Sequence, residues 1–270
     1  SRAIVKIQSG CSQYCSYCIV PSKRGVVYSR PVEEIISEID GLLQAGYREI
    51  VLTGTQIGLY KDFNGRTLIS LLARMDDKFF NRLDRVRLSS ISPSFVNEKL
   101  VDWMKHSPIA CPHLHLSLQS GSNRILQLMN RYYTREEYLE FCQLCQREIP
   151  DFCVTTDVIV GFPGETESDF HDTMSLVQEA CFSKVHVFPF SVRPGTLAEQ
   201  LPDKVPSAEI KKRSSQLLEL SKRISYTIKR SYIGKELEVM IESSCGGFTR
   251  NYLKVLLRSY HMHPTGRLVR

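Results

Sequence analysis

The sequence predicts an α/β fold, a partial (β/α)6 TIM-like barrel followed by a small all-β domain. Three observations lead to this prediction. Short β-branched runs recur six times, each followed by a helical stretch. A long amphipathic basic stretch comes next, and short strand patterns separated by glycines fill the rest of the chain. We therefore expect the barrel over residues 1–206, a basic linker helix over 207–231 and an incomplete β domain over 232–270.

The predicted barrel strands are short apolar runs, alternating or continuous. They cover residues 3–8, 48–53, 84–90, 113–118, 154–160 and 184–190. Helices are predicted between them, for example over 31–46, which begins at a proline and ends at Gly46. Six units are fewer than the eight of a closed barrel, so the barrel is expected to be open. Its ligand sites are expected at the carboxyl ends of the strands.

Composition narrows the class of protein. No apolar run approaches the roughly 20 residues of a membrane helix, so a soluble protein is expected. Residues 211–270 carry 13 lysines and arginines against four glutamates, whereas the first 210 residues carry 22 basic against 25 acidic residues. A basic tail beside a mildly acidic body indicates a part that binds a polyanion, although an ordinary solvated basic helix gives the same pattern.

Three cysteines after the first strand are the most informative motif. Cys11, Cys15 and Cys18 are spaced CxxxCxxC, with Tyr17 just before the last thiol. Three thiolates on one loop can hold three irons of a [4Fe-4S] cluster and leave the fourth iron without a protein ligand. The expected ligand of that open iron is S-adenosylmethionine, which chelates through its amino and carboxylate groups and is split reductively to a radical.

Other uses of the cysteines fit the sequence less well. A zinc site needs a fourth ligand at short spacing, and none follows Cys18. Nine cysteines are an odd number and no secretory signal opens the chain, so disulfides are not expected. The expected location is the reducing cytoplasm. The remaining cysteines are expected at core or helix positions: Cys111, Cys142, Cys145, Cys153, Cys181 and Cys245.

Two loops after strands offer groups that could bind the cofactor. Thr53, Gly54 and Thr55 follow the second strand and present backbone N–H groups for its carboxylate, or further contacts for its amino group. After the fourth strand, a second set offers hydroxyl and amide partners for a ribose: Ser117, Gln119 and Ser120. The nearby Ser122 either joins them or only caps the next helix.

The fifth strand and two arginines complete the predicted cofactor site. Gly161 permits a tight turn at which the backbone can lie against an adenine. Asp157 is a carboxylate in an apolar strand, which requires a partner such as a ligand amine or an arginine. Arg131 and Arg193 could pair with Asp157 or with a cofactor carboxylate, or lie on the surface without a role.

With its motifs in this order, the chain resembles the radical S-adenosylmethionine methylthiotransferases, which replace a C–H bond with a C–SCH3 group. The resemblance rests on four segments: KIQSGCSQYCSYCIVPSKRG, LQSGSNRILQLMNRYYTREEY, DVIVGFPGETESDF and HVFPFSVRPGTLA. Two further segments, VLTGTQIGLY and RVRLSSISP, are similar to the branch that acts on C2 of N6-threonylcarbamoyladenosine next to the tRNA anticodon. The resemblance implies a barrel of the radical SAM type, with Cys11, Cys15 and Cys18 as cluster ligands.

The resemblance also implies partners. They are the anticodon stem-loop of a tRNA and a reductant that supplies electrons, with no membrane and no DNA. The end of the chain resembles the RNA-binding TRAM domain of this family, where Phe248 and Tyr252 are expected either as exposed aromatics for RNA or as core residues. The family carries a second [4Fe-4S] cluster in an N-terminal domain. The given sequence has no counterpart of that domain, so the chain is interpreted as a fragment of a longer protein.

Three alternatives remain open at this point. Two are siblings in the same family, acting on isopentenyladenosine tRNA or on a ribosomal protein. The third belongs to another class, a non-catalytic RNA-binding module with a structural metal at the same cysteines.

Overall fold

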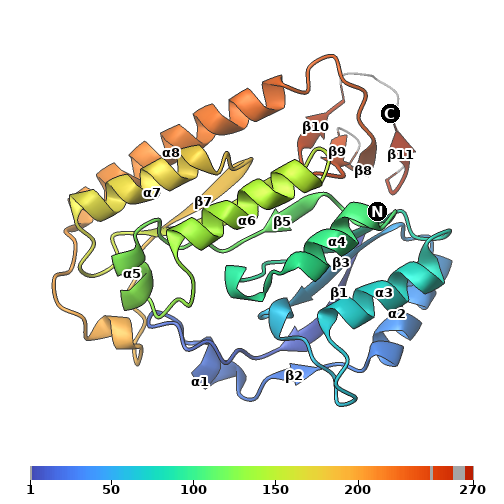
Figure 1. Cartoon of the computed structure of the whole chain (residues 1–270), viewed down its shortest axis with the longest axis horizontal. Coiled ribbons are helices and arrows are strands. Elements are labelled where there is room, and N and C mark those ends of the chain that lie inside the picture. Colours follow the sequence, from blue (N-terminus) through green and yellow to red (C-terminus); the bar gives the residue numbers. More distant parts are fainter. Residues whose placement is uncertain (1, 244–245, 258–264, 270) are drawn as a thin grey trace.

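The structure is a computed structural model that describes residues 2–243, 246–257 and 265–269. Its centre is a curved sheet of six parallel strands (Figure 1). One half has the order β1-β3-β4 and the other β5-β6-β7, and two isolated parallel bridges join them, Val86 to Ala110 and Ile91 to Leu116. The strands are β1 (Arg2–Ser9), β3 (Glu49–Gly54), β4 (Arg85–Leu88), β5 (His113–His115), β6 (Cys153–Val160) and β7 (Lys184–Pro189). The predicted six-stranded partial barrel is confirmed.

Helices cover the outer face of this sheet. The longer ones are α2 (Val32–Gln44), α3 (Leu68–Phe79), α4 (Glu98–His106), α6 (Arg135–Glu148), α7 (Glu167–Glu179) and α8 (Ser207–Arg230). Shorter elements lie at the carboxyl ends of the strands: α1 (Val20–Arg24), β2 (Tyr28–Ser29), η1 (Ile57–Leu59), η2 (Pro93–Phe95), α5 (Asn123–Leu128) and η3 (Leu197–Glu199). Capping boxes at Thr67, Thr134 and Thr166 begin α3, α6 and α7, which fixes where each strand-to-helix loop ends.

The inner face of the sheet is only partly filled by side chains, whereas the interior of a closed barrel is packed throughout. Along β1, Val5 and Ile7 are fully buried in the core against the helices. Ile4 points the other way and is 69% exposed, and Lys6 on the same face is also exposed. We call this concave inner face the chamber; it is open to solvent beside β1.

The linker helix α8 packs as its periodicity predicts. Leu217 and Leu220 are buried in the barrel core, and Ile224 packs against it. Arg213, one of the basic residues of the tail, is also buried and pairs with Glu165 at 2.7 Å. This charge therefore belongs to the fold and is not available to a partner.

A second, antiparallel sheet follows α8. Its order is β10-β9-β8-β11, formed by β8 (Val239–Ser243), β9 (Gly246–Thr249), β10 (Lys254–Leu256) and β11 (Leu268–Val269). It lies beside the start of β1, at the end of the barrel opposite α1 (Figure 1). Arg85 at the start of β4 donates to the carbonyl of Phe248 at 3.0 Å, and Arg2 pairs with Glu242 at 3.1 Å.

The two aromatics of this sheet pack inward. The rings of Phe248 and Tyr252 stack with centroids 4.7 Å apart, and Tyr252 lies 4.8 Å from His113 and 4.6 Å from the Arg87 guanidinium. Both side chains are half-buried and lie outside the apolar core clusters, so the two alternatives, exposure to RNA and core packing, stay predictions. The two rings close the amino end of the chamber, because Arg87 and His113 both come from barrel strands.

Most of the other cysteines lie where expected. Cys111, Cys142, Cys145 and Cys153 are buried. The expectation is wrong for Cys181, which is exposed in the turn after α7 with a φ of 52°. Cys245 lies outside the described residues. In the described segments, none of the helices has the length and apolarity required to cross a membrane.

Candidate active site

The cysteine loop connects β1 to α1 and is fixed by contacts from distant parts of the chain. The N–H of Ser16 donates to the carbonyl of Met129 at 3.0 Å, and its hydroxyl donates to the carbonyl of Leu128 at 2.7 Å. Its own carbonyl accepts from the N–H of Ala198 at 2.8 Å. At the start of the loop, Gly10 has a φ of +79°, and a Cβ there would lie 2.7 Å from a backbone oxygen, so only glycine fits.

The three predicted ligands are half-buried at the end of this loop. Burial raises the pKa of Cys11 and of Cys18, and the neighbouring Cys15 raises both further. Thiols that are costly to ionise side by side gain most from a cation that accepts all three thiolates. A cavity of about 280 Å³ opens beside Cys15 and Cys18, with Gly195 and Leu197 on its other wall.

The spacing of the thiols distinguishes a cluster from a single zinc ion. A zinc ion holds sulfurs at about 2.3 Å, which places them roughly 3.8 Å apart. The sulfurs of Cys11, Cys15 and Cys18 do not all lie within 4.8 Å of one another, as far as the described residues were searched. Ligands of different irons in a cluster stand farther apart, because each thiolate binds its own iron. The donor set therefore fits a [4Fe-4S] cluster better than zinc.

Arg131 reaches this loop from the segment after α5. Its Nη1 lies 3.2 Å from Cys15 Sγ, and its Nη2 donates to Ser92 Oγ at 3.0 Å. The guanidinium also lies 5.0 Å from the Tyr133 ring centre. The sequence predicts that Arg131 pairs with Asp157 or with a cofactor carboxylate. Among the described residues its contacts are instead with the cysteine loop and its surroundings. It supplies a positive charge beside Cys15, the middle one of the three predicted ligands.

A chain of buried amides continues from Ser92 beneath the loop. Gln13 donates to Ser92 Oγ at 3.4 Å, Gln56 donates to Gln13 Oε1 at 3.2 Å, and the N–H of Gln56 donates to Gln8 Oε1 at 2.9 Å. Every member is buried. Such a fully paired network holds a single arrangement of the loops after β1, β3 and β4.

A second cavity of about 280 Å³ adjoins the loop on the side of β6 and β7. Four predicted cofactor residues line it: Tyr17, Gln119, Asp157 and Arg193. Ile159, Phe188 and Phe190 supply its apolar walls. A cavity with several apolar walls and a few convergent polar groups is typical of a small-molecule site. Tyr17 therefore places this cavity and the cluster loop side by side.

Gln119 occupies a special backbone position in this cavity. Its φ is 69°, in the left-handed region that non-glycine residues rarely adopt. Its N–H donates to the carbonyl of Asp157 at 2.8 Å, and its carbonyl accepts from the N–H of Ile159 at 2.9 Å. These two bonds fix the residue against β6, so that its side chain lines the cavity.

The partner of Asp157 is one that the sequence did not indicate. The carboxylate lies 3.0 Å from Nε2 of His115, and neither predicted arginine contacts it among the described residues. His186 of β7 stands opposite Asp157 in the strand register. The available signal was the alternation of histidine with apolar residues in HLHLSL and KVHVFPF, which places both histidines on the chamber face.

The remaining predicted residues lie outside the second cavity. Thr53, Gly54 and Thr55 end β3, and a Cβ on Gly54 would lie 2.9 Å from the Gln8 carbonyl. The carbonyl of Ser117 accepts from Tyr133, the hydroxyl of Ser120 accepts from the N–H of Ser122, and Ser122 caps α5. Gly161 lies against Ile210 of α8. Their cofactor roles stay predictions.

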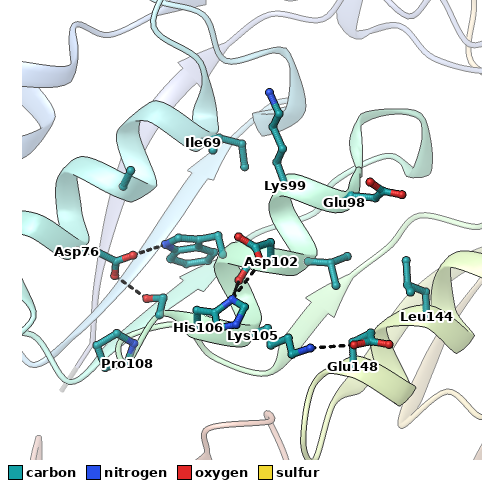
Figure 2. Close-up of a pocket in the computed structure, with 14 residues that line it drawn as sticks. Ile69, Asp76, Glu98, Lys99, Asp102, Lys105, His106, Pro108, Leu144 and Glu148 are labelled. Atoms are coloured by element: carbon teal, nitrogen blue, oxygen red, sulfur yellow. Dashed lines mark hydrogen bonds and ion pairs between the residues drawn. The ribbon is translucent and has the colours of Figure 1, made fainter.

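A cavity of about 910 Å³, larger than the two at the cysteine loop, lies elsewhere, between α3, α4 and α6 on the outer face (Figure 2). Several of its polar groups are paired with one another. Asp76 accepts from Trp103 Nε1 at 2.6 Å and from Ser107, and Lys105 pairs with Glu148 at 2.9 Å. It contains none of the predicted site residues, so the chemistry is assigned to the smaller cavities at the cluster loop.

Comparison with known proteins supports this assignment. The family model described as "Radical SAM superfamily" matches residues 5–177, which include the cysteine loop and most of the barrel. This chain belongs to the radical SAM superfamily. Among solved structures, a radical S-adenosylmethionine methyltransferase from Kitasatospora setae shares the fold, with a TM-score of 0.61 and 18% identity over 73% of this chain and 38% of its own. Methylornithine synthase is similar, with a TM-score of 0.56 and 16% identity over 82% of this chain and 62% of its own.

Closer relatives are found by sequence. A threonylcarbamoyladenosine tRNA methylthiotransferase from Chlamydia pneumoniae is 42% identical over 91% of this chain and 58% of its own length. The Bacillus subtilis protein of the same name is 38% identical over 96% of this chain and 59% of its own. A tRNA-2-methylthio-N(6)-dimethylallyladenosine synthase from a Thermoanaerobacter strain is 42% identical over 89% and 51%. The chain thus spans between half and three fifths of these relatives.

Proposed function

We propose that this chain is the radical-generating and RNA-binding part of a tRNA methylthiotransferase that modifies C2 of N6-threonylcarbamoyladenosine. The observation that carries the proposal is that one loop serves two cavities. Cys15 and Cys18 line the first, and Tyr17 between them lines the second with Gln119 and Asp157. A cluster and the nucleoside part of a small cofactor would therefore lie in contact with each other. The names of the sequence relatives supply the substrate class.

In this proposal each part of the loop has its own task. Cys11, Cys15 and Cys18 hold a [4Fe-4S] cluster, and Gln119 and Arg193 hold S-adenosylmethionine beside it. When bound, the cluster supplies the electron that splits the cofactor to methionine and a 5′-deoxyadenosyl radical. The protein fixes the distance between the cofactor and the target C–H bond and excludes water. The second cluster that the resemblance implies is not assigned to any residue of this chain.

The open chamber supports entry of a base. On β7, Lys184 and Phe188 face the same side as Asp157 and are exposed, as Ile4 and Lys6 of β1 are. An exposed aromatic ring and two ammonium groups suit stacking and phosphate contact with a nucleotide that leaves its helix. The base would then reach the cofactor cavity from within the barrel.

We assign a TRAM-like unit to residues 232–270. The basic tail supports RNA binding by this unit and by the helix before it. Six exposed lysines and arginines lie along α8: Lys211, Lys212, Lys222, Arg223, Lys229 and Arg230. Because they form phosphate contacts in this proposal, tRNA affinity should fall steeply with salt. Lys222→Glu with Lys229→Glu should weaken binding and make that slope shallower by about one per lost contact. The matched control is Lys99→Glu, which changes an exposed lysine on α4 instead of α8.

The chemistry is tested by anaerobic reconstitution with iron and sulfide, followed by dithionite and S-adenosylmethionine. Mass spectrometry should detect 5′-deoxyadenosine with the wild type and with Cys142→Ala, and none with Cys15→Ala. A cluster that assembles without any product would contradict the radical assignment. Zinc in place of iron would favour the non-catalytic RNA-binding module.

The substrate is tested by comparing anticodon stem-loops. Stem-loops carrying threonylcarbamoyladenosine should bind more tightly than those carrying isopentenyladenosine. Equal affinity would contradict the preference for threonylcarbamoyladenosine, and tighter binding of the isopentenyladenosine stem-loop would make that branch the better assignment. A salt-independent, weak interaction with every RNA would instead favour the ribosomal-protein branch.

A further inference from the structure

Three side chains of the chamber form a compact group below the cofactor cavity. His115 on β5, Asp157 on β6 and His186 on β7 come from adjacent strands, and one ligand atom of each lies within 4.8 Å of the other two. Across the described residues this is the one group of three or more histidine, cysteine or acidic side chains that approach so closely. Its members are half-buried, and Asp157 also lines the cavity above.

Hydrogen bonds orient the group. Nε2 of His115 lies 3.0 Å from Asp157 Oδ2, and its Nδ1 lies 2.9 Å from Thr155 Oγ1. The same hydroxyl lies 3.1 Å from Nε2 of His113. A partner on the second ring nitrogen is the usual means by which proteins fix a metal-binding imidazole. Thr155 thus holds the His115 ring with Nε2 directed at the centre of the group.

The electrostatics suit a cation. His186 comes from the strand next to that of Asp157 and stands opposite it in the strand register. The ring centres of His115 and His186 are 5.7 Å apart, with Asp157 contributing a negative charge between their strands. Among the described residues no arginine or lysine is paired with that carboxylate.

The ligand set selects the type of metal. Two imidazole nitrogens and one carboxylate oxygen favour Zn²⁺, Fe²⁺ or Co²⁺ over Mg²⁺ and Ca²⁺, which prefer oxygen ligands. Tetrahedral zinc needs such ligand atoms roughly 3.4 Å apart, because its bonds are about 2.0–2.1 Å long. The ligand atoms of the three residues already lie within 4.8 Å of one another, so small shifts of Asp157 and His186 toward His115 would complete this geometry.

We propose that His115, Asp157 and His186 bind one divalent transition-metal ion, whose remaining coordination position faces the chamber. Three protein ligands with an open position are the arrangement of catalytic rather than structural zinc sites. The open position would accept water or an oxygen or nitrogen donor of the base in the chamber. This site shares Asp157 with the cofactor cavity but none of the three cluster ligands, and its metal affinity can be measured without the proposed radical activity.

Cobalt provides the test, because high-spin Co²⁺ gives an electron paramagnetic resonance signal and the oxidised [4Fe-4S] cluster gives none. The chain is prepared without a histidine tag, loaded with its cluster, freed of excess iron and titrated anaerobically with Co²⁺. We expect one Co²⁺ per chain, displaced by Zn²⁺ and not by Mg²⁺. His115→Ala and His186→Ala should abolish the signal, and Thr155→Val should weaken binding by about 10- to 100-fold. His171→Ala, an exposed histidine on α7, is the control and should bind as the wild type does.

The wild-type titration decides first, whatever the variants do. Absence of stoichiometric Co²⁺ binding overturns the proposal, and so does unchanged binding in a folded His115→Ala or His186→Ala chain. Circular dichroism establishes that each variant is folded, and a variant that is not folded is replaced by the glutamine substitution at the same position. Loss of 5′-deoxyadenosine formation would not count against the site, since the readout is metal affinity.

Discussion

Removing the charge of Arg131 should make the cluster harder to reduce. The guanidinium lies 3.2 Å from Cys15 Sγ and is held there by Ser92 and by the ring of Tyr133. Burial alone would lower the pKa of Arg131, but the surrounding tyrosines and Cys15 raise it overall, so the residue stays charged. Arg131→Met keeps the length and apolar volume of the side chain and removes both the charge and the N–H···S bond.

The size of the effect follows from that bond. A hydrogen bond to a charged group contributes about 1.5–3 kcal/mol. For a one-electron couple, 1.4 kcal/mol corresponds to about 59 mV, so the full bond is equivalent to about 60–130 mV. That range is an upper limit, because the oxidised cluster also accepts the bond. The sign is set by charge, since a cation beside the cluster stabilises the more negative, reduced state.

The assay is a redox titration of the reconstituted protein, monitored by the paramagnetic signal of the reduced cluster. Arg131→Met should shift the midpoint by several tens of millivolts to more negative values. Arg131→Lys should recover part of the shift, because it keeps the charge without bridging Cys15 and Ser92. Arg124→Met, which removes a nearby arginine paired with Asp169, is the control and should leave the potential unchanged. An unchanged or more positive midpoint in Arg131→Met would refute the reasoning.

Three further predictions concern the cluster ligands and the fold. Cys15→Ala should abolish the absorbance of the cluster, whereas Cys142→Ala should retain it and lower the free energy of unfolding by about 1 kcal/mol, measured in urea. Glu165→Gln should lower the free energy of unfolding by about 3 kcal/mol, because buried Arg213 then keeps only Glu167 and Glu209 as partners. An unchanged urea midpoint would contradict this. Although burial acts to raise the pKa of Asp169, its hydrogen bonds to Arg124, Ser122 and Thr166 lower it, so this carboxylate stabilises the fold at neutral pH and loses its contribution as the pH falls below about 4. Asp169→Asn should therefore be less stable than the wild type at pH 7, and its free energy of unfolding should change less as the pH falls. If the two proteins lose stability in parallel as the pH falls, the prediction is wrong.

The fold was largely predictable because its signals are local. Each barrel strand is a short apolar run, and each helix carries its own amphipathic pattern and, at Thr67, Thr134 and Thr166, its own cap. The small β sheet was also predicted as strands. Its packing was not, since Tyr252 reaches the chamber with a φ of 69° that no local pattern indicated.

The site was predictable in its ligands and less so in its contacts. Tyr17, Gln119, Asp157 and Arg193 were named from separate loops, and the rule that parallel strands gather their ligands at one end brings them into one cavity. The partners were missed where they depend on chain folding over long separations. Arg131 meets Cys15 across 116 residues. His115 meets Asp157 across two adjacent strands, and a strand pattern gives the face of each residue but not the register between them.

The cluster loop shows how such long-range contacts bear on function. A loop that had to be ordered by its metal would spend part of the binding free energy on that ordering, as small zinc domains do. Here the protein itself bonds Ser16 on three sides, to Leu128, Met129 and Ala198. The thiols are consequently held half-buried, and Cys15 lies close enough to raise the pKa of Cys11 and of Cys18. The free energy of cluster binding is then available to ionise the three thiols, so the loop functions as a preorganised receptor and the fold of the barrel determines its geometry.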